Sequence, residues 1–72
     1  MKFKTYYREL AKNVRIERAR RRISQLKLAE LADVSLDTIG LIEREAANPT
    51  LTTLISIAKA LNVDLNTLIP LN

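Results

Sequence analysis

Apolar positions recur at helical spacing along most of the chain, and no segment shows the alternation that is typical of a half-buried strand. The first series follows the i, i+3, i+4, i+7 pattern of one helix face and consists of Tyr7, Leu10, Ala11 and Val14. This series predicts a helix over about 6–22. We expect residues 1–5, which precede the series, to form a loose N-terminal arm.

Residues that can cap a helix divide the rest of the chain. Ser24, Ser35 and Thr50 each precede a segment with helical periodicity, and a hydroxyl there can accept a hydrogen bond from a free backbone N–H. The predicted helices cover about 25–32, 36–44 and 51–61, followed by a last turn through Ile69 that Asp64 can cap. With 72 residues, the chain is expected to form one all-α domain of five helices over 1–72.

A short break separates the second and third predicted helices. Asp33 lies in the break, and Asp tolerates a left-handed conformation better than most residues. Val34 is apolar and can fill the turn, while the small Ala29 allows the two helices to cross closely. These features predict a helix-turn-helix near residues 24–45. An ordinary corner between two helices has the same pattern, so the pattern alone leaves both interpretations open.

The composition argues against several classes of protein. The chain has no Cys and no His, and it lacks a Gly-rich phosphate loop and clustered metal-ligand spacing, so we expect no enzyme, no metal and no cofactor. No apolar run is long enough to cross a bilayer, and the first residues lack the apolar segment of a signal peptide. We therefore expect a cytoplasmic protein with no membrane partner and no small-molecule ligand.

Charge is distributed unevenly along the chain. Residues 1–22 contain nine Lys and Arg against two Glu, a net charge of +7, whereas residues 23–72 have a net charge of −3. A basic segment of this kind indicates a polyanionic partner. A solvated helix face is an equally ordinary explanation for a run of charges.

A longer string of residues favours the helix-turn-helix. It consists of Arg18, Ser24-Gln25, Leu28-Ala29, Val34-Ser35, Ile39, Ile42-Glu43, Pro49, Leu54, Ile57-Ala58, Ala60-Leu61, Val63 and Leu68. At these spacings, residues 14–69 resemble the phage-repressor-like (Cro/Xre-type) helix-turn-helix family. The resemblance implies a compact five-helix, lambda-repressor-like fold. It also implies a repressor or controller of transcription that binds double-stranded DNA as a homodimer on an inverted repeat.

The resemblance also implies roles for individual residues. Gln25 matches the residue that fixes the domain to a phosphate, as suits a helix N-terminus with free N–H groups. Arg44 and Asn48 match a loop that contacts the DNA backbone, and Arg18 and Glu43 match a partly buried ion pair. The positions that match base-facing side chains are Leu36, Asp37 and Leu41, with Thr38 and Gly40 close by.

The predicted recognition helix departs from the family in its chemistry. A helical projection places Asp37, Gly40, Leu41 and Arg44 on its exposed face. Family members often carry hydrogen-bond donors on this face, whereas here an acid, a glycine and a leucine take three of the four positions. Residues 23–45 have a net charge of −3, which phosphates repel. A leucine on this face can still contact a thymine methyl group, and Asp37 can accept from a cytosine amino group.

Arginines at the end of the first predicted helix can offset this acidity. Arg21 and Arg22 stand beside Gln25 and are predicted to contact the same phosphates. The alternative is a structural role, in which they interact with the helix C-terminus and with Glu17. For Arg20 the two roles are equally plausible.

A protein-binding module, such as an antitoxin-like protein or an adaptor, is the alternative function. Four leucines fall toward exposed faces of the predicted helices, and an apolar patch can bind a protein partner; they are Leu26, Leu31, Leu36 and Leu41. The candidates for a dimer interface lie near the C-terminal end and are Ile55, Leu65, Ile69 and Leu71, although core packing also explains them.

Overall fold

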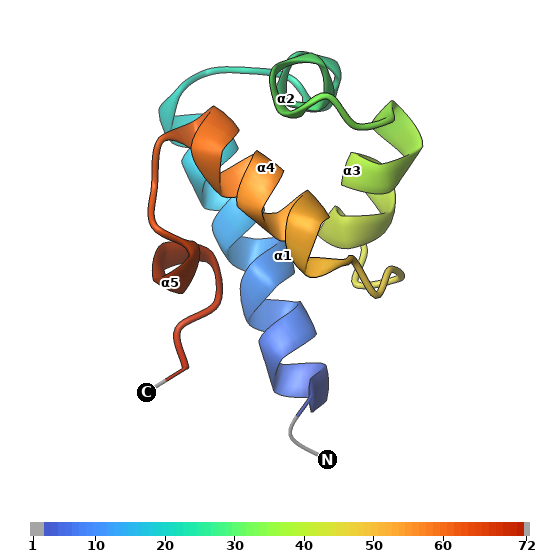
Figure 1. Ribbon diagram of the computed structural model, residues 1–72, viewed down its shortest axis with the longest axis vertical. Coiled ribbons are helices and arrows are strands. Elements are labelled where there is room, and N and C mark those ends of the chain that lie inside the picture. Colours follow the sequence, from blue (N-terminus) through green and yellow to red (C-terminus); the bar gives the residue numbers. More distant parts are fainter. Residues whose placement is uncertain (1–2, 72) are drawn as a thin grey trace.

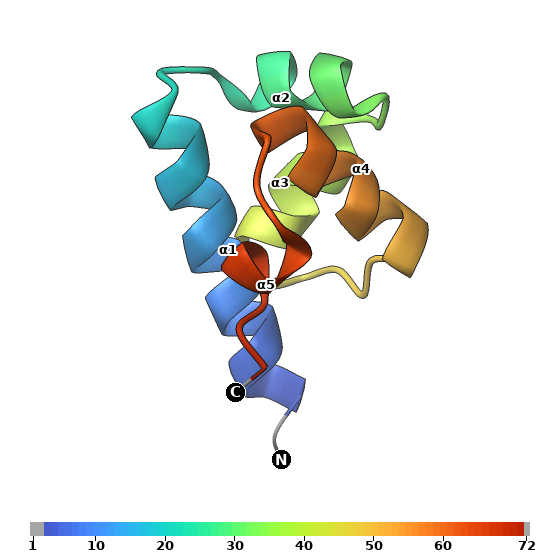
Figure 2. The same cartoon turned by 60° about the vertical axis from the view of Figure 1, so that its left-hand side comes forward.

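The computed structural model describes residues 3–71, which form five helices (Figure 1). They are α1 (Phe3–Arg20), α2 (Gln25–Ala32), α3 (Leu36–Glu43), α4 (Leu51–Leu61) and α5 (Leu65–Leu68). The described part of the chain contains no strand, so the prediction of an all-α fold is confirmed. Two views show α2 and α3 toward one end of the molecule, while the N-terminal turns of α1 project beyond the other helices (Figures 1 and 2).

The core lies where the amphipathic faces of the helices meet. α1 packs against α3 and α5, and α2 packs against α3 and α4. The largest fully buried side chains are Val14, Leu28, Ile39, Ile57, Leu61 and Leu68. Burying one such side chain contributes about 1.5–3 kcal/mol to the free energy of unfolding. Ala29, only 2% exposed, allows α2 and α3 to approach closely, as predicted.

The first helix differs from its prediction at both ends. It begins at Phe3, so residues 3–5, expected as part of a loose arm, are helical; residues 1 and 2 lie outside the described part. At its other end the helix stops at Arg20, two residues earlier than predicted. It stops because Arg22 adopts a left-handed conformation with φ 55°.

The other long helices end in the same way as α1. The residues that end α1 to α4 with a positive φ are Arg22, Asp33, Glu45 and Asn62. At each end, the N–H of the next residue donates to a carbonyl five residues back, for example Val34 to Ala29 at 3.0 Å and Ala46 to Leu41 at 2.8 Å. This is the Schellman motif. Glycine is the usual residue at its positive-φ position, because other residues are strained in that conformation. The prediction of a left-handed Asp33 is confirmed.

Three of the four predicted side-chain N-caps are present, whereas the side chain of Asp64 makes no capping hydrogen bond at the start of α5. The hydroxyl groups of Ser24, Ser35 and Thr50 accept hydrogen bonds from the backbone N–H three residues later, at 3.0–3.1 Å. These bonds satisfy N–H groups that the first turn of a helix leaves free and fix where α2, α3 and α4 begin.

Two further findings concern the described residues only. None of their helices is both long and apolar enough to cross a membrane. They also contain no group of three or more acidic, His or Cys side chains placed to hold a metal ion.

Candidate nucleic-acid interface

α2 and α3 form the predicted helix-turn-helix, joined by a turn at residues 33–35. Val34 is half-buried in this turn and packs against the core, which matches its predicted role. One side of α3 is fixed to the body through Ile39 and Ile42, both at most 2% exposed. The opposite side, the outer face of α3, is directed away from the core.

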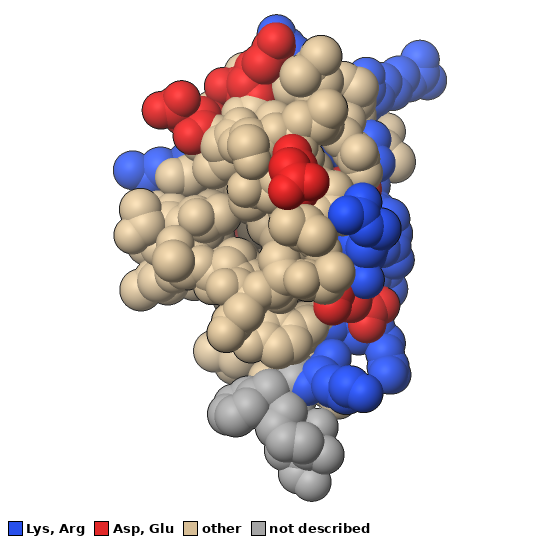
Figure 3. All heavy atoms as spheres, turned by 90° about the vertical axis from the view of Figure 1, so that its right-hand side faces the viewer, with Lys and Arg blue, Asp and Glu red and all other residues tan. Residues whose placement is uncertain are grey.

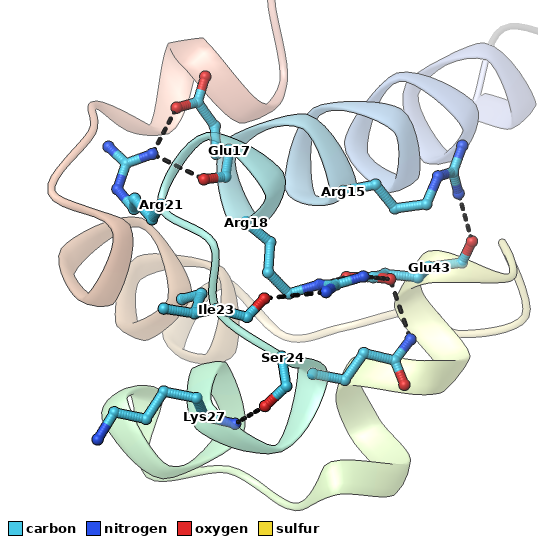
Figure 4. Close-up of polar contacts among 9 residues, drawn as sticks. Arg15, Glu17, Arg18, Arg21, Ile23, Ser24, Lys27 and Glu43 are labelled. Carbon is cyan, nitrogen blue, oxygen red and sulfur yellow. Dashed lines mark hydrogen bonds and ion pairs between the residues drawn. The ribbon is translucent and has the colours of Figure 1, made fainter.

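A buried carboxylate connects α3 to the two helices before it. Glu43, 7% exposed, accepts from Arg18 Nε at 2.8 Å and from Arg18 Nη2 at 3.0 Å, so the predicted ion pair is present (Figure 4). Its Oε1 also accepts from Gln25 Nε2 at 3.0 Å. The forked geometry of the guanidinium suits such a two-point contact with a carboxylate. The three side chains, which we call the Glu43 cluster, set the position of α3 relative to α1 and to the start of α2.

The pKa of the Glu43 carboxyl depends on two opposing effects, burial on one side and hydrogen bonds together with nearby positive charges on the other. Burial by itself raises the pKa, because it disfavours the charged form. The hydrogen bonds from Arg18 and Gln25, together with the positive charges of Arg18 and Arg15, outweigh burial, and the pKa lies below its ordinary value. The carboxylate is therefore ionised at neutral pH.

Two arginines of α1 also satisfy backbone carbonyls at the ends of segments. Arg15 Nη1 donates to the carbonyl of Glu43 at the end of α3, and Arg18 Nη1 donates to the carbonyl of Ile23 at 3.0 Å (Figure 4). Part of the basic side of α1 therefore has a structural role. The contact of Arg15 with α3 is not predictable from the sequence, because nothing in the local spacing relates two residues so far apart.

A second buried acid, Glu17, holds the arginines at the end of α1. Glu17 is 6% exposed and pairs with Arg20 at 3.2 Å and with Arg21 at 2.8 Å. Arg21 donates to the Glu17 backbone carbonyl as well, at 2.9 Å (Figure 4). The contact with Glu17 that was considered as an alternative role for Arg21 is therefore present. Arg22 is exposed and follows the end of α1, and no acid pairs with it among the described residues.

The outer face of α3 agrees only partly with the helical projection. Leu36, 46% exposed, and Asp37 are directed to solvent, as predicted. Leu41 is half-buried, and so is Thr38, whose hydroxyl lies 2.8 Å from that of Ser35. The prediction that Gly40 is exposed is wrong.

Gly40 is buried because a neighbouring side chain covers it. A Cβ added at Gly40 would lie 3.1 Å from Nη1 of Arg44, so the guanidinium of Arg44 rests over this glycine. Arg44 itself is exposed. The outer face of α3 thus presents the Arg44 guanidinium at the place where the projection put a bare glycine.

Asn48, the other residue predicted to contact the DNA backbone, is exposed in the loop between α3 and α4. Its Oδ1 accepts a hydrogen bond from the Tyr7 hydroxyl at 2.9 Å, which fastens this loop to α1. The side-chain nitrogen of Asn48 has no partner within residues 3–71.

Basic side chains gather along one edge of the face that carries α3 (Figure 3). The exposed basic residues of α1 are Lys4, Arg8, Lys12, Arg15 and Arg20. The middle of this face consists mainly of uncharged groups with a few separate acids (Figure 3). The face therefore combines a positive border with a nearly uncharged centre.

The sequence comparison agrees with this geometry. Residues 14–68 match the helix-turn-helix family model HTH_3. The chain belongs to the Cro/C1-type (Xre) helix-turn-helix family. It is 49% identical over 53 residues to control protein C.SmaI of Serratia marcescens. That match covers 74% of this chain and 63% of the relative's length, slightly less than two thirds.

Solved structures show the same fold. The restriction-modification controller protein C.AhdI from Aeromonas hydrophila has a TM-score of 0.84 at 25% identity, over 88% of this chain and 96% of that one. A hypothetical transcription factor, NHTF, from Neisseria has a TM-score of 0.86 at 28% identity, over 89% and 74% of the two chains. An HTH_3 family transcriptional regulator from Vibrio cholerae has a TM-score of 0.85 at 29% identity, over 90% of this chain and 36% of that one. The lambda-repressor-like five-helix fold is confirmed, and the relatives are named as regulators rather than enzymes.

Proposed function

We propose that this chain is a cytosolic, sequence-specific DNA-binding regulator of transcription of the controller type. The observation that carries the proposal is the outer face of α3, which is directed to solvent while the Glu43 cluster fixes the other side of the helix. A helix held in this way can enter a major groove without changing its position in the domain. The names of the relatives, a control protein and a restriction-modification controller, favour the same class.

The start of α2 is proposed to bind a phosphate. Ser24 caps the N–H of Lys27, and the N–H groups of Gln25 and Leu26 have no acceptor within residues 3–71. Free N–H groups and the positive end of the helix dipole attract an anion there. Gln25 Nε2 donates one N–H to Glu43 and has a second N–H that can donate to a ligand. Arg22, exposed just before this helix, adds positive charge.

The remaining contacts follow from this placement. Asn48 would contact the backbone on the far side through its side-chain nitrogen, while Leu36 and Asp37 would meet base edges. Leucine suits a thymine methyl group and Asp suits a cytosine amino group. Thr38 and Leu41, both half-buried, would stand beside these contacts. Phosphate contacts position the domain, and base contacts supply the specificity.

A homodimer on an inverted repeat completes the proposal. Two copies related by a two-fold axis would place their α3 helices in successive major grooves, about 34 Å apart. Ile55, 41% exposed, and Leu71, 68% exposed, are candidates for the contact between copies. Leu65 and Ile69, the other two candidates, are half-buried and contribute to the packing of their own chain.

Selection of duplexes from a random pool tests the proposal. At low salt, the protein should enrich an inverted repeat with half-sites about 10 base pairs apart, and its affinity should fall steeply as salt rises. Gln25→Ala should weaken binding to all duplexes by a similar factor of about 10, because a phosphate contact carries no sequence information. A protein that binds no duplex at low salt would refute the proposal.

A protein-binding module remains the second candidate, on one observation. Leu26 and Leu31 of α2 are 53% and 51% exposed, which is more apolar surface than the DNA contacts above require. A complex formed through these leucines would change little with salt, whereas DNA binding would weaken. Leu26→Ser combined with Leu31→Ser should leave DNA binding intact and remove such a partner.

A further inference from the structure

The side chain of Arg44 lies across Gly40 on the outer face of α3. An ideal Cβ added to Gly40 would come within 3.1 Å of Arg44 Nη1 and 3.9 Å of Arg44 Cζ. Arg44 stands four residues after Gly40, and side chains of a helix lean toward its N-terminus. A long side chain at this position therefore extends back over the middle of α3. The missing side chain of Gly40 supplies the space in which the guanidinium lies.

Arg44 also lacks the acidic partner that three arginines at or just after the end of α1 have. The buried carboxylates of Glu17 and Glu43 pair with Arg18, Arg20 and Arg21. Within residues 3–71, the structure gives the Arg44 side chain no ion pair and no hydrogen bond. Its planar set of five N–H donors is therefore available to a ligand.

The two most exposed side chains at the start of α3 cannot supply such a donor. Leu36 is apolar and Asp37 only accepts hydrogen bonds when it is ionised, so neither can donate to a base. Guanine presents two acceptors, O6 and N7, at its edge in the major groove, and the fork of an arginine matches both at once. Although Arg44 is the residue that ends α3, its guanidinium extends back over Gly40, on the same side of the helix as Asp37.

We propose that Arg44 recognises a guanine through its major-groove edge, and that Gly40 is a specificity-determining residue because it leaves room for the guanidinium to lie against α3. This inference rests on the proposed function, and it replaces the contact with the DNA backbone that the family resemblance implies for Arg44. Holding the side chain along the helix before binding also reduces the rotamer entropy lost on binding.

Gly40→Ala separates this role from a purely structural one. An added Cβ would displace the tip of a flexible side chain and would meet no backbone, so the fold should persist. Alanine is also the better helix former, and the midpoint of thermal unfolding should stay the same or rise. The displaced guanidinium should nevertheless discriminate less well between G·C and the other pairs at one position of each half-site.

The experiment begins with the duplex that the unaltered protein selects from a random pool. Each base pair of the half-site is then replaced in turn, and the dissociation constants are measured at one salt concentration. Arg44→Ala should abolish the preference at a single G·C pair, a loss of about 5- to 150-fold in discrimination. Arg44→Lys should lose most of that discrimination although it keeps the charge, because an ammonium group cannot make the forked contact.

Arg22→Ala is the matched control, since it removes an exposed arginine outside α3. It should weaken binding to every duplex by the same factor. If Arg44→Ala behaves like this control, Arg44 contacts only phosphate and the inference is wrong. Unchanged preference in Gly40→Ala would likewise overturn the role of Gly40. If the unaltered protein binds no duplex, the proposed function fails, and this inference fails with it.

Discussion

The inner side of α3 holds Ile39, Ile42 and Glu43, all at most 7% exposed, whereas the outer face presents Leu36 and Asp37 to solvent. On the inner side, apolar packing and a fully paired carboxylate leave no polar group without a partner. On the outer face, the charged groups have no partner within residues 3–71. One helix therefore carries a fixed side and a side whose donors and acceptors remain available.

This difference separates the residues that determine the fold from those that determine recognition. Substitutions on the inner side should alter stability, because they disturb buried contacts. Substitutions on the outer face should alter the choice of ligand and leave stability nearly unchanged.

Arg18→Ala should have the largest effect, a loss of about 3 kcal/mol in the free energy of unfolding, because it leaves the Glu43 carboxylate buried without its main partner. Denaturant unfolding measures it. Arg8→Ala, an exposed arginine on the same helix, should change the free energy by less than about 0.5 kcal/mol. Adding Glu43→Gln to Arg18→Ala should restore part of the loss; equal stability of Arg18→Ala and the unaltered protein would show that the Glu43 cluster contributes nothing.

Asp37→Ala tests the outer face. It should change the preference at one base pair by about 1–3 kcal/mol, measured against the same panel of single-pair replacements. Its effect on unfolding should be no more than about 0.5–1 kcal/mol, through the lost interaction of Asp37 with the N-terminus of α3. A large loss of stability with unchanged base preference would show that Asp37 stabilises the fold and does not contact a base.

Low pH should reduce the free energy of unfolding through the inner side of α3, where Glu43 is buried. The pKa of Glu43 is lower in the folded protein than in the unfolded chain, because Arg18 and Gln25 stabilise the carboxylate. Its contribution is therefore complete above the ordinary Glu pKa of about 4.3 and is lost as the pH falls from there through the lower folded pKa. Unfolding curves across this range should show a weaker pH dependence for Glu43→Gln than for the unaltered protein; identical slopes would contradict the assignment.

The smallest effect concerns the end of α3. Glu45 has φ 61°, a conformation in which glycine is not strained. Glu45→Gly should raise the free energy of unfolding by about 0.5–1 kcal/mol. Glu45→Ala removes the same charge without relieving the backbone and should not raise it, and equal values for the two variants would refute the explanation.

Much of the inner side could be predicted because it follows from local rules and from family spacing. The capping hydroxyls of Ser24 and Ser35, the left-handed Asp33 and the Arg18–Glu43 pair all occupy their expected places. Each depends on a residue type whose chemistry suits one position in the fold. A helical period and a cap are enough to locate such residues.

The outer face was harder to predict, because the exposure of a residue there depends on the conformations that long neighbouring side chains adopt. A helical projection gives the direction of a Cβ, but Gly40 has none, and the covering group comes from Arg44 one turn later. The end of α1 was misplaced for a similar reason. Its arginines continue the helical pattern, and no glycine marks the point at which Arg22 turns to a positive φ.

The pairing of Arg21 with Glu17 was one of two interpretations that the sequence left open. Spacing of four residues permits the contact, but it does not show that Glu17 is buried. Burial of this acid depends on the tertiary packing of α1, which no local pattern expresses. The same holds for Arg15, whose carbonyl partner lies at the far end of another helix.

The Glu43 cluster joins three successive segments through one carboxylate, and this has an evolutionary consequence under the proposed function. Because hydrogen bonds of Glu43 connect α2 and α3 behind the surface, exchanging Leu36, Asp37 or Arg44 should leave the angle between these two helices unchanged. A lineage that inherits this scaffold can acquire a new operator through a few point substitutions, without passing through an unfolded intermediate. Operator and regulator can therefore diverge together in small steps.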